Sequence, residues 1–176
     1  MTTRRFVLLF SVLLLSGAFA LATSNYEYGA DEYVTVASGV SPDGNFAITA
    51  HGTGYLGYDK FHLYLNDAIA GKTIAPLKEI VDTRDTKADA FAAKWSSDSR
   101  QVIIIYRVGR SLKAVAYRID SGRARPTKGP FEILNKDLPN KRSLSASDKE
   151  LLKYWQTETS KTPSPRVFGT PLKDDQ

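Results

Sequence analysis

Two stretches of the chain decide the fold: Val40–Thr49 (VSPDGNFAIT) and Trp95–Arg107 (WSSDSRQVIIIYR). Each places a tight turn directly before an apolar strand. In the first stretch, proline presets φ, aspartate bonds to its own backbone and glycine accepts a positive φ. In the second, Ser96–Ser99 (SSDS) takes the same place before the strand Gln101–Val108. The two stretches therefore predict two strand–turn–strand units of the same kind.

The similarity extends beyond the two turns. Val36–Thr49 aligns with Ala92–Ile105, so that each copy has a small or apolar strand, the turn and a second apolar strand. Each copy then continues into another strand and a turn that contains glycine, at Gly71 in the first copy and Gly122 in the second. Self-similarity at a fixed period is typical of blade-like or stacked β-units.

The other candidate strands are rich in β-branched and aromatic residues and alternate with a period of two. In Phe61–Leu65, for example, the apolar side chains share one face. This pattern predicts an all-β fold with antiparallel sheets from two blade-like four-stranded repeats, arranged as a sandwich or a partial propeller. The predicted strands are Asp31–Ala37, Asn45–His51, Phe61–Leu65, Lys78–Val81, Ala90–Trp95, Gln101–Val108, Leu112–Asp120 and Gly129–Leu134.

The runs VSPDGNFAIT and WSSDSRQVIIIYR resemble the W-S-P-D-G-K blade core of TolB-like (PD40, WD40-like) β-propeller repeats. The resemblance covers Val36 to Asp120. The first copy lacks the tryptophan of that pattern, and the second lacks its proline and glycine. Two units are also fewer than the four blades of the smallest propellers. The resemblance implies partner binding rather than catalysis.

A short C-terminal helix follows the strands. Ser147-Asp-Lys-Glu150 matches a capping box, and Leu151, Leu152 and Trp155 then recur on one helical face up to about Thr157. We expect this face to dock on the sheet, so that residues 31–157 form one all-β domain with a C-terminal helix. Residues 158–176 contain three prolines and few apolar residues, which predicts a disordered tail.

The N-terminus has the pattern of a secretory signal peptide in residues 1–22. Arg4 and Arg5 precede an apolar run, and Ala20 and Ala22 match an A-x-A site, which predicts cleavage before Thr23. Cleavage after Ala20 and an uncleaved N-terminal anchor are the alternatives. The apolar run is shorter than the ~20 residues that span a bilayer as a helix, which favours cleavage. Residues 23–30 are polar and are predicted to be flexible.

The composition limits the candidate cellular compartments and the candidate partners of the protein. The chain has no cysteine, which excludes a disulfide framework and an acylated cysteine, and no asparagine lies in an N-x-S/T acceptor. An exported chain of this composition fits a periplasmic or secreted bacterial protein. The net charge of +5 falls when the two arginines of the signal peptide leave, and nucleic-acid binding is not predicted.

The basic residues are densest between Arg107 and Arg125 and around Lys141–Arg142. Such a cluster has two interpretations, a solvated basic face or a weak attraction to anionic envelope surfaces. We expect the solvated face.

Three patterns raise the question of catalysis or cofactor binding. Gly52, Gly54 and Gly57 form a literal G-x-G-x-x-G, but the following segment has a strand period, so we expect a hairpin loop and no nucleotide. His51 and His62 could face each other across a hairpin and form a zinc site with Asp59, although ordinary strand histidines are expected. No cofactor and no metal are predicted.

Three aspartates lie in one loop, VDTRDTKADAF, where Arg84 and Lys87 separate Asp82, Asp85 and Asp89. Paired carboxylates serve acid–base catalysis or calcium binding in other proteins. This spacing matches no calcium loop, so a solvated, self-neutralised turn is expected. No G-x-S-x-G elbow is present, and no catalytic residue is predicted.

The predicted binding residues are Tyr55, Tyr58, Arg107 and Arg110. In the repeat alignment they occupy equivalent hairpin tips and would lie on one edge of the fold, where loops on a rigid sheet commonly carry function. Tyrosine and arginine are frequent in binding hot spots, although they are also common exposed rim residues. The sequence therefore predicts a non-enzymatic binding or accessory module for an envelope protein or a glycan. The alternatives are a self-associating structural protein that forms homo-oligomers and a metal-dependent enzyme.

Overall fold

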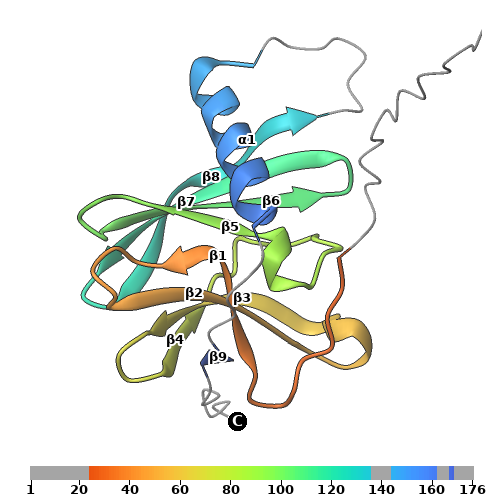
Figure 1. Cartoon of the computed structure of the whole chain (residues 1–176), viewed down its shortest axis with the longest axis vertical. Helices are drawn as coiled ribbons and strands as arrows, with labels where there is room; N and C mark the ends of the chain where they lie inside the picture. The colour runs from red at the N-terminus through yellow and green to blue at the C-terminus, as the bar shows by residue number, and fades with distance from the viewer. Residues whose placement is uncertain (1–23, 136–143, 162–166, 169–176) are drawn as a thin grey trace, which may run out of the picture.

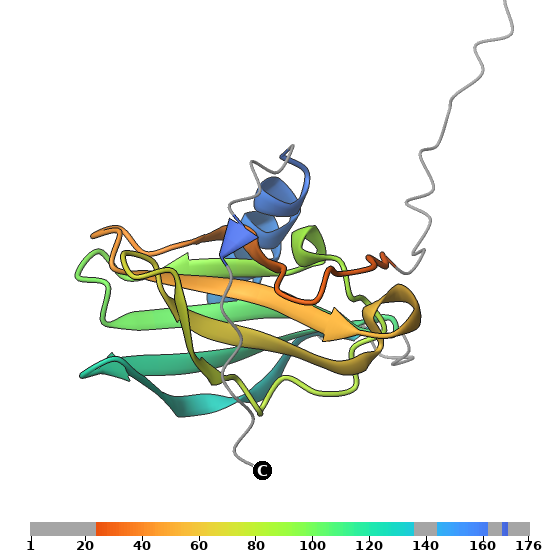
Figure 2. The ribbon, with the colours of Figure 1, turned by 90° about the horizontal axis from the view of Figure 1, so that it is seen from below.

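The computed structural model describes residues 24–135, 144–161 and 167–168. Eight strands lie side by side in one curled sheet in the order β4-β3-β2-β1-β5-β6-β7-β8, and β9 pairs with β1 (Figures 1 and 2). The strands are β1 (Tyr33–Val40), β2 (Phe46–Thr53), β3 (Asp59–Asp67), β4 (Lys72–Pro76), β5 (Ala92–Trp95), β6 (Gln101–Val108), β7 (Ser111–Asp120), β8 (Arg123–Asn135) and β9 (Val167–Phe168).

The sheet consists of two runs of antiparallel neighbours. Strands β1 to β4 pair in sequence order, and so do β5 to β8. The runs meet where β1 and β5 lie parallel, with Ala37 opposite Ala92. The all-β prediction is therefore confirmed in its coarse form. The prediction of purely antiparallel sheets is wrong, because the segment after β4 crosses back and sets β5 beside β1 in the same direction.

The turns at Ser41 and Ser96 have the same hydrogen bonds. The hydroxyl of Ser41 donates to Asp43 and accepts from the backbone N–H of Phe46, at 2.6 and 2.9 Å. The hydroxyl of Ser96 makes the equivalent bonds to Asp98 and Gln101 at the same two distances. In each turn this serine lowers the pKa of its aspartate. The turns also contact each other, because the hydroxyl of Ser99 accepts a hydrogen bond from the backbone N–H of Asp43.

The main core lies on the inner side of the curl. The predicted face of the β3 strand is confirmed, since Leu63 and Leu65 are fully buried and Phe61 packs against the same cluster. Tyr106 and Tyr117 enter this core from the other half of the sheet. One apolar cluster therefore holds the two halves together.

Helix α1 (Ala146–Thr159) packs on the outer side of the second half of the sheet. Leu151, Leu152 and Trp155 contact a second cluster that includes Ile105 and Leu112, as predicted. The cap differs from the predicted capping box. Ser145, two residues earlier, accepts from the backbone N–H of Asp148 and begins the helix.

One further strand prediction fails in the fold, and part of the predicted tail has regular structure. Lys78–Val81 is no strand, because Pro76 ends β4 and the next residues anchor the chain through buried Leu77 and Ile80. The tail 158–176 is not wholly irregular, since the helix runs to Thr159 and β9 pairs antiparallel with the start of β1. Strand β5 meets β1 only at Ala37, so the edge of β1 at residues 33–34 is left for β9.

The predicted signal peptide, residues 1–22, lies outside the described residues. In the part of the chain that is described, no helix is both long enough and apolar enough to cross a membrane.

Candidate functional site

The N-terminal segment, which is predicted to be flexible, leads into the candidate site, and its described residues contact the core of the fold. Tyr28 is buried in the main core, where its ring meets Tyr26 edge-on at 4.8 Å between ring centroids. Its hydroxyl donates to the carbonyl of Thr86, and burial raises the pKa of this phenol. Tyr26 in turn donates through its hydroxyl to Glu32. The segment has little apolar content, yet two aromatic rings fix it to the sheet.

The loop between β2 and β3 contains a single 3₁₀ turn, η1 (Tyr55–Gly57). Three glycines allow it to pack closely, as the hairpin prediction requires. A Cβ on Gly52 would lie 2.1 Å from the carbonyl oxygen of Gly57, and one on Gly54 would lie 2.0 Å from the Asp59 carboxylate. The G-x-G-x-x-G pattern is therefore explained by close packing within the hairpin and against the N-terminal segment.

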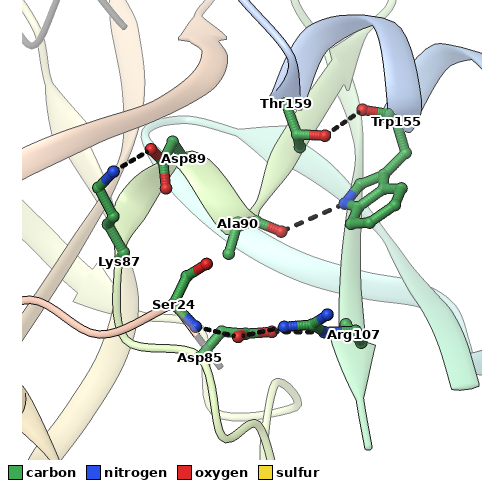
Figure 3. Close-up of a pocket in the computed structure, with 8 residues that line it drawn as sticks. All are labelled: Ser24, Asp85, Lys87, Asp89, Ala90, Arg107, Trp155 and Thr159. Carbon is green, nitrogen blue, oxygen red and sulfur yellow. Dashed lines mark hydrogen bonds and ion pairs between the residues drawn. The ribbon is translucent and has the colours of Figure 1, made fainter. Parts of the chain in front are cut away.

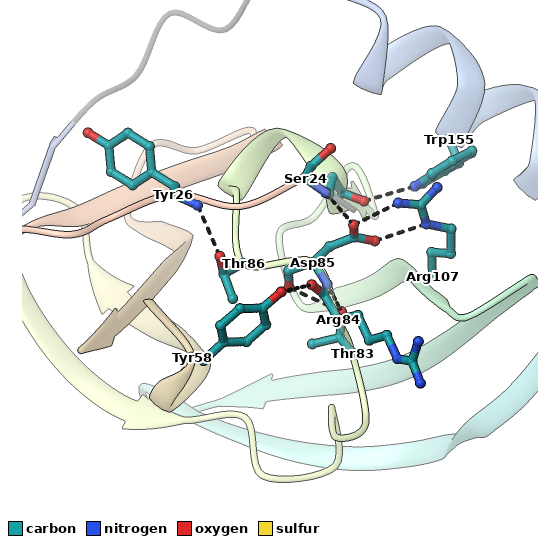
Figure 4. Close-up of polar contacts among 10 residues, drawn as sticks. Ser24, Tyr26, Tyr58, Thr83, Arg84, Asp85, Thr86, Arg107 and Trp155 are labelled. Carbon is teal, nitrogen blue, oxygen red and sulfur yellow. Dashed lines mark hydrogen bonds and ion pairs between the residues drawn. The ribbon is translucent and has the colours of Figure 1, made fainter. Parts of the chain in front are cut away.

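Tyr55 and Tyr58 both face solvent from this loop. Tyr55 is 78% exposed and Tyr58 is 46% exposed. The Tyr58 hydroxyl reaches the carbonyl of Arg84 at 3.4 Å, on the segment that follows β4 (Figure 4). The loop thus presents two aromatic side chains to solvent while its backbone is held.

Thr86 connects the N-terminal segment to the tyrosine loop. Its hydroxyl donates to the carbonyl of Leu56 at 2.6 Å and accepts from the backbone N–H of Tyr26 at 3.0 Å. Its own backbone N–H donates to the carbonyl of Ser24 at 2.8 Å. Because Thr86 is buried, these bonds are shielded from water and fix three segments to one another.

Asp85 and Arg107 form an ion pair beside Thr86 (Figure 4). Nε and a terminal nitrogen of Arg107 donate to the two carboxylate oxygens at 3.0 and 2.7 Å. The backbone N–H of Ser24 donates to the same carboxylate at 2.8 Å. The side chains of Asp85 and Arg107 are only 3% and 14% exposed. The prediction of a solvated aspartate loop is therefore wrong at Asp85, and Arg107 is no exposed rim residue.

The other aspartates of the loop fit the prediction better. Asp82 is exposed, and Asp89 forms an ion pair with half-exposed Lys87 at 2.6 Å. Arg110 lies exposed in the turn between β6 and β7. Of the four predicted binding residues, Tyr58 and Arg107 thus come together through Arg84 and Asp85.

A pocket of about 240 Å³ opens next to this ion pair (Figure 3). Its lining is mostly polar and charged and comes from the N-terminal segment, the loop after β4, β6 and the end of α1. The indole N–H of Trp155 donates to the carbonyl of Ala90 at 3.2 Å and so fixes the helix to that loop. The lining residues are Ser24, Asp85, Lys87, Asp89, Ala90, Arg107, Trp155 and Thr159.

The two histidines lie opposite each other on β2 and β3, as the hairpin predicts. They do not form a metal site with Asp59. The Nδ1 atom of His51 contacts the carbonyl of Glu32 at 2.9 Å, and its ring stacks on Tyr33. Burial, and then the charge of Lys78, lowers the pKa of His62. Among residues 24–135, 144–161 and 167–168, no three His, Cys, Asp or Glu side chains are grouped to hold a metal ion.

Sequence reasoning missed Ser24, Thr86 and Trp155 as parts of this region. Their partners are distant in the chain, as when Trp155 bonds to Ala90 and Ser24 to Asp85. One signal was available for the ion pair. Arg107 falls at an alternating position of the strand Gln101–Val108, on the face of the sheet that the helix covers. A charged side chain on a covered face needs a partner.

Replacing Gly57 with Ala should destabilise the loop, because a Cβ there would lie 2.6 Å from the carbonyl oxygen of Tyr26. Gly71 is the matched control, since its φ of +68° is close to the +71° of Gly57 and its Cβ would meet open space. Overpacking should make Gly57→Ala about 1–3 kcal/mol more costly than Gly71→Ala in urea unfolding. Equal losses for both variants would show that the close approach to Tyr26 is unimportant.

Comparison with known proteins finds no matching family model, no matching curated protein and no matching solved structure.

Proposed function

We propose that this chain is an exported, non-enzymatic binding module that recognises its partner with the tyrosine loop. The observation that carries the proposal is the combination of two exposed tyrosines with a fixed backbone. Tyr55 and Tyr58 face solvent, while the buried Thr86 hydroxyl donates a hydrogen bond to the carbonyl of Leu56, which lies between them in the chain. Tyrosines are enriched in binding hot spots, and a surface ordered before binding loses less entropy when the partner arrives.

Arg107 supports this surface from behind. Its ion pair with Asp85 positions the segment that carries Arg84, and the Arg84 carbonyl accepts from Tyr58. Arg107 is therefore a positioning residue rather than a contact residue. Arg110, in the neighbouring turn, remains a proposed contact.

Export is supported by the pattern of residues 1–22, with two arginines, an apolar run and an A-x-A site. An exported chain meets its partner in the periplasm or outside the cell. An envelope protein or a glycan is the proposed partner class, because tyrosine side chains contact both through their ring faces and hydroxyl groups.

Two observations support a two-unit architecture that resembles TolB-like blades. The turns at Ser41 and Ser96 make the same hydrogen bonds. Each turn also belongs to a run of four consecutive antiparallel strands. We propose that the runs β1–β4 and β5–β8 are two such units, joined through β1 and β5.

The edges of the sheet weaken the alternative of self-association. Strand β8 carries Pro126 and Pro130, which cannot donate to a further strand, and exposed cations lie between and beside them. Strand β4 is five residues long and ends at Pro76. Short edges, prolines and charges are the features by which proteins avoid edge-to-edge pairing.

The test is affinity capture from an envelope extract with residues 23–176 as bait. The double variant Tyr55→Ser/Tyr58→Ser should recover its partner roughly tenfold less well, because it removes both aromatic contacts. Ile69→Ser is the matched control, since Ile69 is also 78% exposed but lies in the turn between β3 and β4. An array of glycans probed with the same three proteins separates a glycan partner from a protein partner.

Equal recovery by the wild-type chain and the double variant would contradict the proposed surface. Loss of recovery in Ile69→Ser as well would show that binding depends on general surface apolarity instead.

A further inference from the structure

A second surface lies on the outer face of the β7–β8 hairpin, away from the tyrosine loop. Along β7, Tyr117 and Ile119 point into the main core. Because successive side chains of a strand alternate between the faces, Ala116, Arg118 and Asp120 lie on the opposite, outer face. Arg118 is exposed there, with 57% of its side chain accessible.

The register of β8 adds further cations to this face. Arg125 pairs directly with Arg118, Lys128 with Ala116, and Arg123 with Asp120. Residues opposite each other in an antiparallel pair share a face of the sheet. Arg118, Arg123, Arg125 and Lys128 are all exposed, and we call these four residues the basic face.

The basic face has little internal neutralisation among the described residues. Arg118 and Arg125 are like charges directly opposite each other, an arrangement that is unfavourable without counter-charge. Asp120 lies at 3.4 Å from Arg118, with both side chains about half exposed. On the same outer face, by contrast, Lys94 is paired with Glu150 of α1. The basic face therefore has an excess of positive charge.

The shape of the basic face indicates the kind of partner. The cations are spread over two neighbouring strands at the free edge of the sheet, and none of them lines the pocket described above. Lys128 lies over the ring of Phe131, at 4.3 Å from its centroid, which holds its ammonium group against the sheet. An open array of this kind fits many anions presented on a surface better than one anion in a cavity.

From this arrangement we infer that the basic face binds the phosphate-bearing surface of an anionic lipid bilayer. The cations would contact lipid phosphates while the tyrosine loop, on a different part of the fold, stays free for its partner. This interaction is independent of the proposed function, because the two surfaces share no residue.

The experiment is co-sedimentation of the chain 23–176 with vesicles at low salt. Vesicles of equal parts phosphatidylcholine and phosphatidylglycerol should bind the chain, whereas pure phosphatidylcholine vesicles should not. The variant Arg118→Gln/Arg125→Gln/Lys128→Gln should bind the anionic vesicles about a hundredfold more weakly, since each basic residue near such a surface contributes several-fold. High salt should release the wild-type chain.

The control variant Lys60→Gln/Lys72→Gln/Lys78→Gln removes the same charge from exposed positions on β3, on β4 and in the segment after β4. It should bind almost as well as the wild-type chain. Equal losses in the two variants would show that net charge, and not the basic face, causes binding. Absence of wild-type binding to anionic vesicles, or binding to a soluble acidic polysaccharide alone, would overturn the inference. Circular dichroism and urea unfolding of both variants exclude loss through misfolding.

Discussion

Replacing Arg107 with Met should lower the free energy of unfolding by about 3–5 kcal/mol, because breaking a buried ion pair leaves an uncompensated charge. Among the described residues, the Asp85 carboxylate would then keep the backbone N–H of Ser24 as its partner. Methionine retains much of the volume of the arginine stem, so little of the loss would come from a cavity. Urea unfolding followed by tryptophan fluorescence measures the difference.

The same loop provides a matched control in Lys87, which pairs with Asp89 at its surface. Lys87→Met also breaks an ion pair, but Lys87 is half exposed. Exposed ion pairs contribute about 0–1 kcal/mol to stability, so this variant should lose no more than that. The double variant Asp85→Ala/Arg107→Met should lose less than the sum of its single variants, because each single change already breaks the pair. A loss under 1 kcal/mol for Arg107→Met would mean that the pair does not organise the loop.

Replacing Tyr28 with Ala should cost about 3–5 kcal/mol, the range for removing a large aromatic side chain from a core. Tyr28 contacts Tyr26 and His51 with its ring and donates to Thr86 with its hydroxyl. Tyr28→Phe keeps the ring and loses the donor to a buried carbonyl, so it should cost about 1–3 kcal/mol. The ordering of the two variants separates packing from hydrogen bonding.

Tyr55→Ala is the control for Tyr28→Ala, since Tyr55 is largely exposed and such surface changes stay within about 0.5 kcal/mol. If both alanine variants unfold at the same urea concentration as the wild-type chain, the N-terminal segment does not belong to the core. If Tyr28→Ala alone is destabilised, the segment is part of the fold.

Local sequence patterns were sufficient for most strands and for the helix. The turn at Ser41 and the strand Gln101–Val108 could be predicted because proline, aspartate and alternation act over a few residues. The apolar face of the helix could be predicted in the same way. In each of these cases the deciding interactions connect residues close together in the chain.

The candidate site was harder to predict, because its contacts join distant segments. Ser24 and Asp85 are 61 residues apart, and Asp85 and Arg107 are 22 apart. The mixed charges of VDTRDTKADAF are typical of a solvated turn, and nothing local marks Asp85 as the buried member. The contacts of the polar N-terminal segment were missed for the same reason, since they include hydrogen bonds to the distant Thr86.

The most direct test of the proposed recognition surface is site-specific photo-crosslinking in the living cell. A benzophenone amino acid would replace Tyr55 in one strain and Ile69 in another, because the two side chains are equally exposed. We expect a discrete crosslinked product from position 55 that is absent from position 69. No product at position 55, or the same product at both positions, would contradict this expectation.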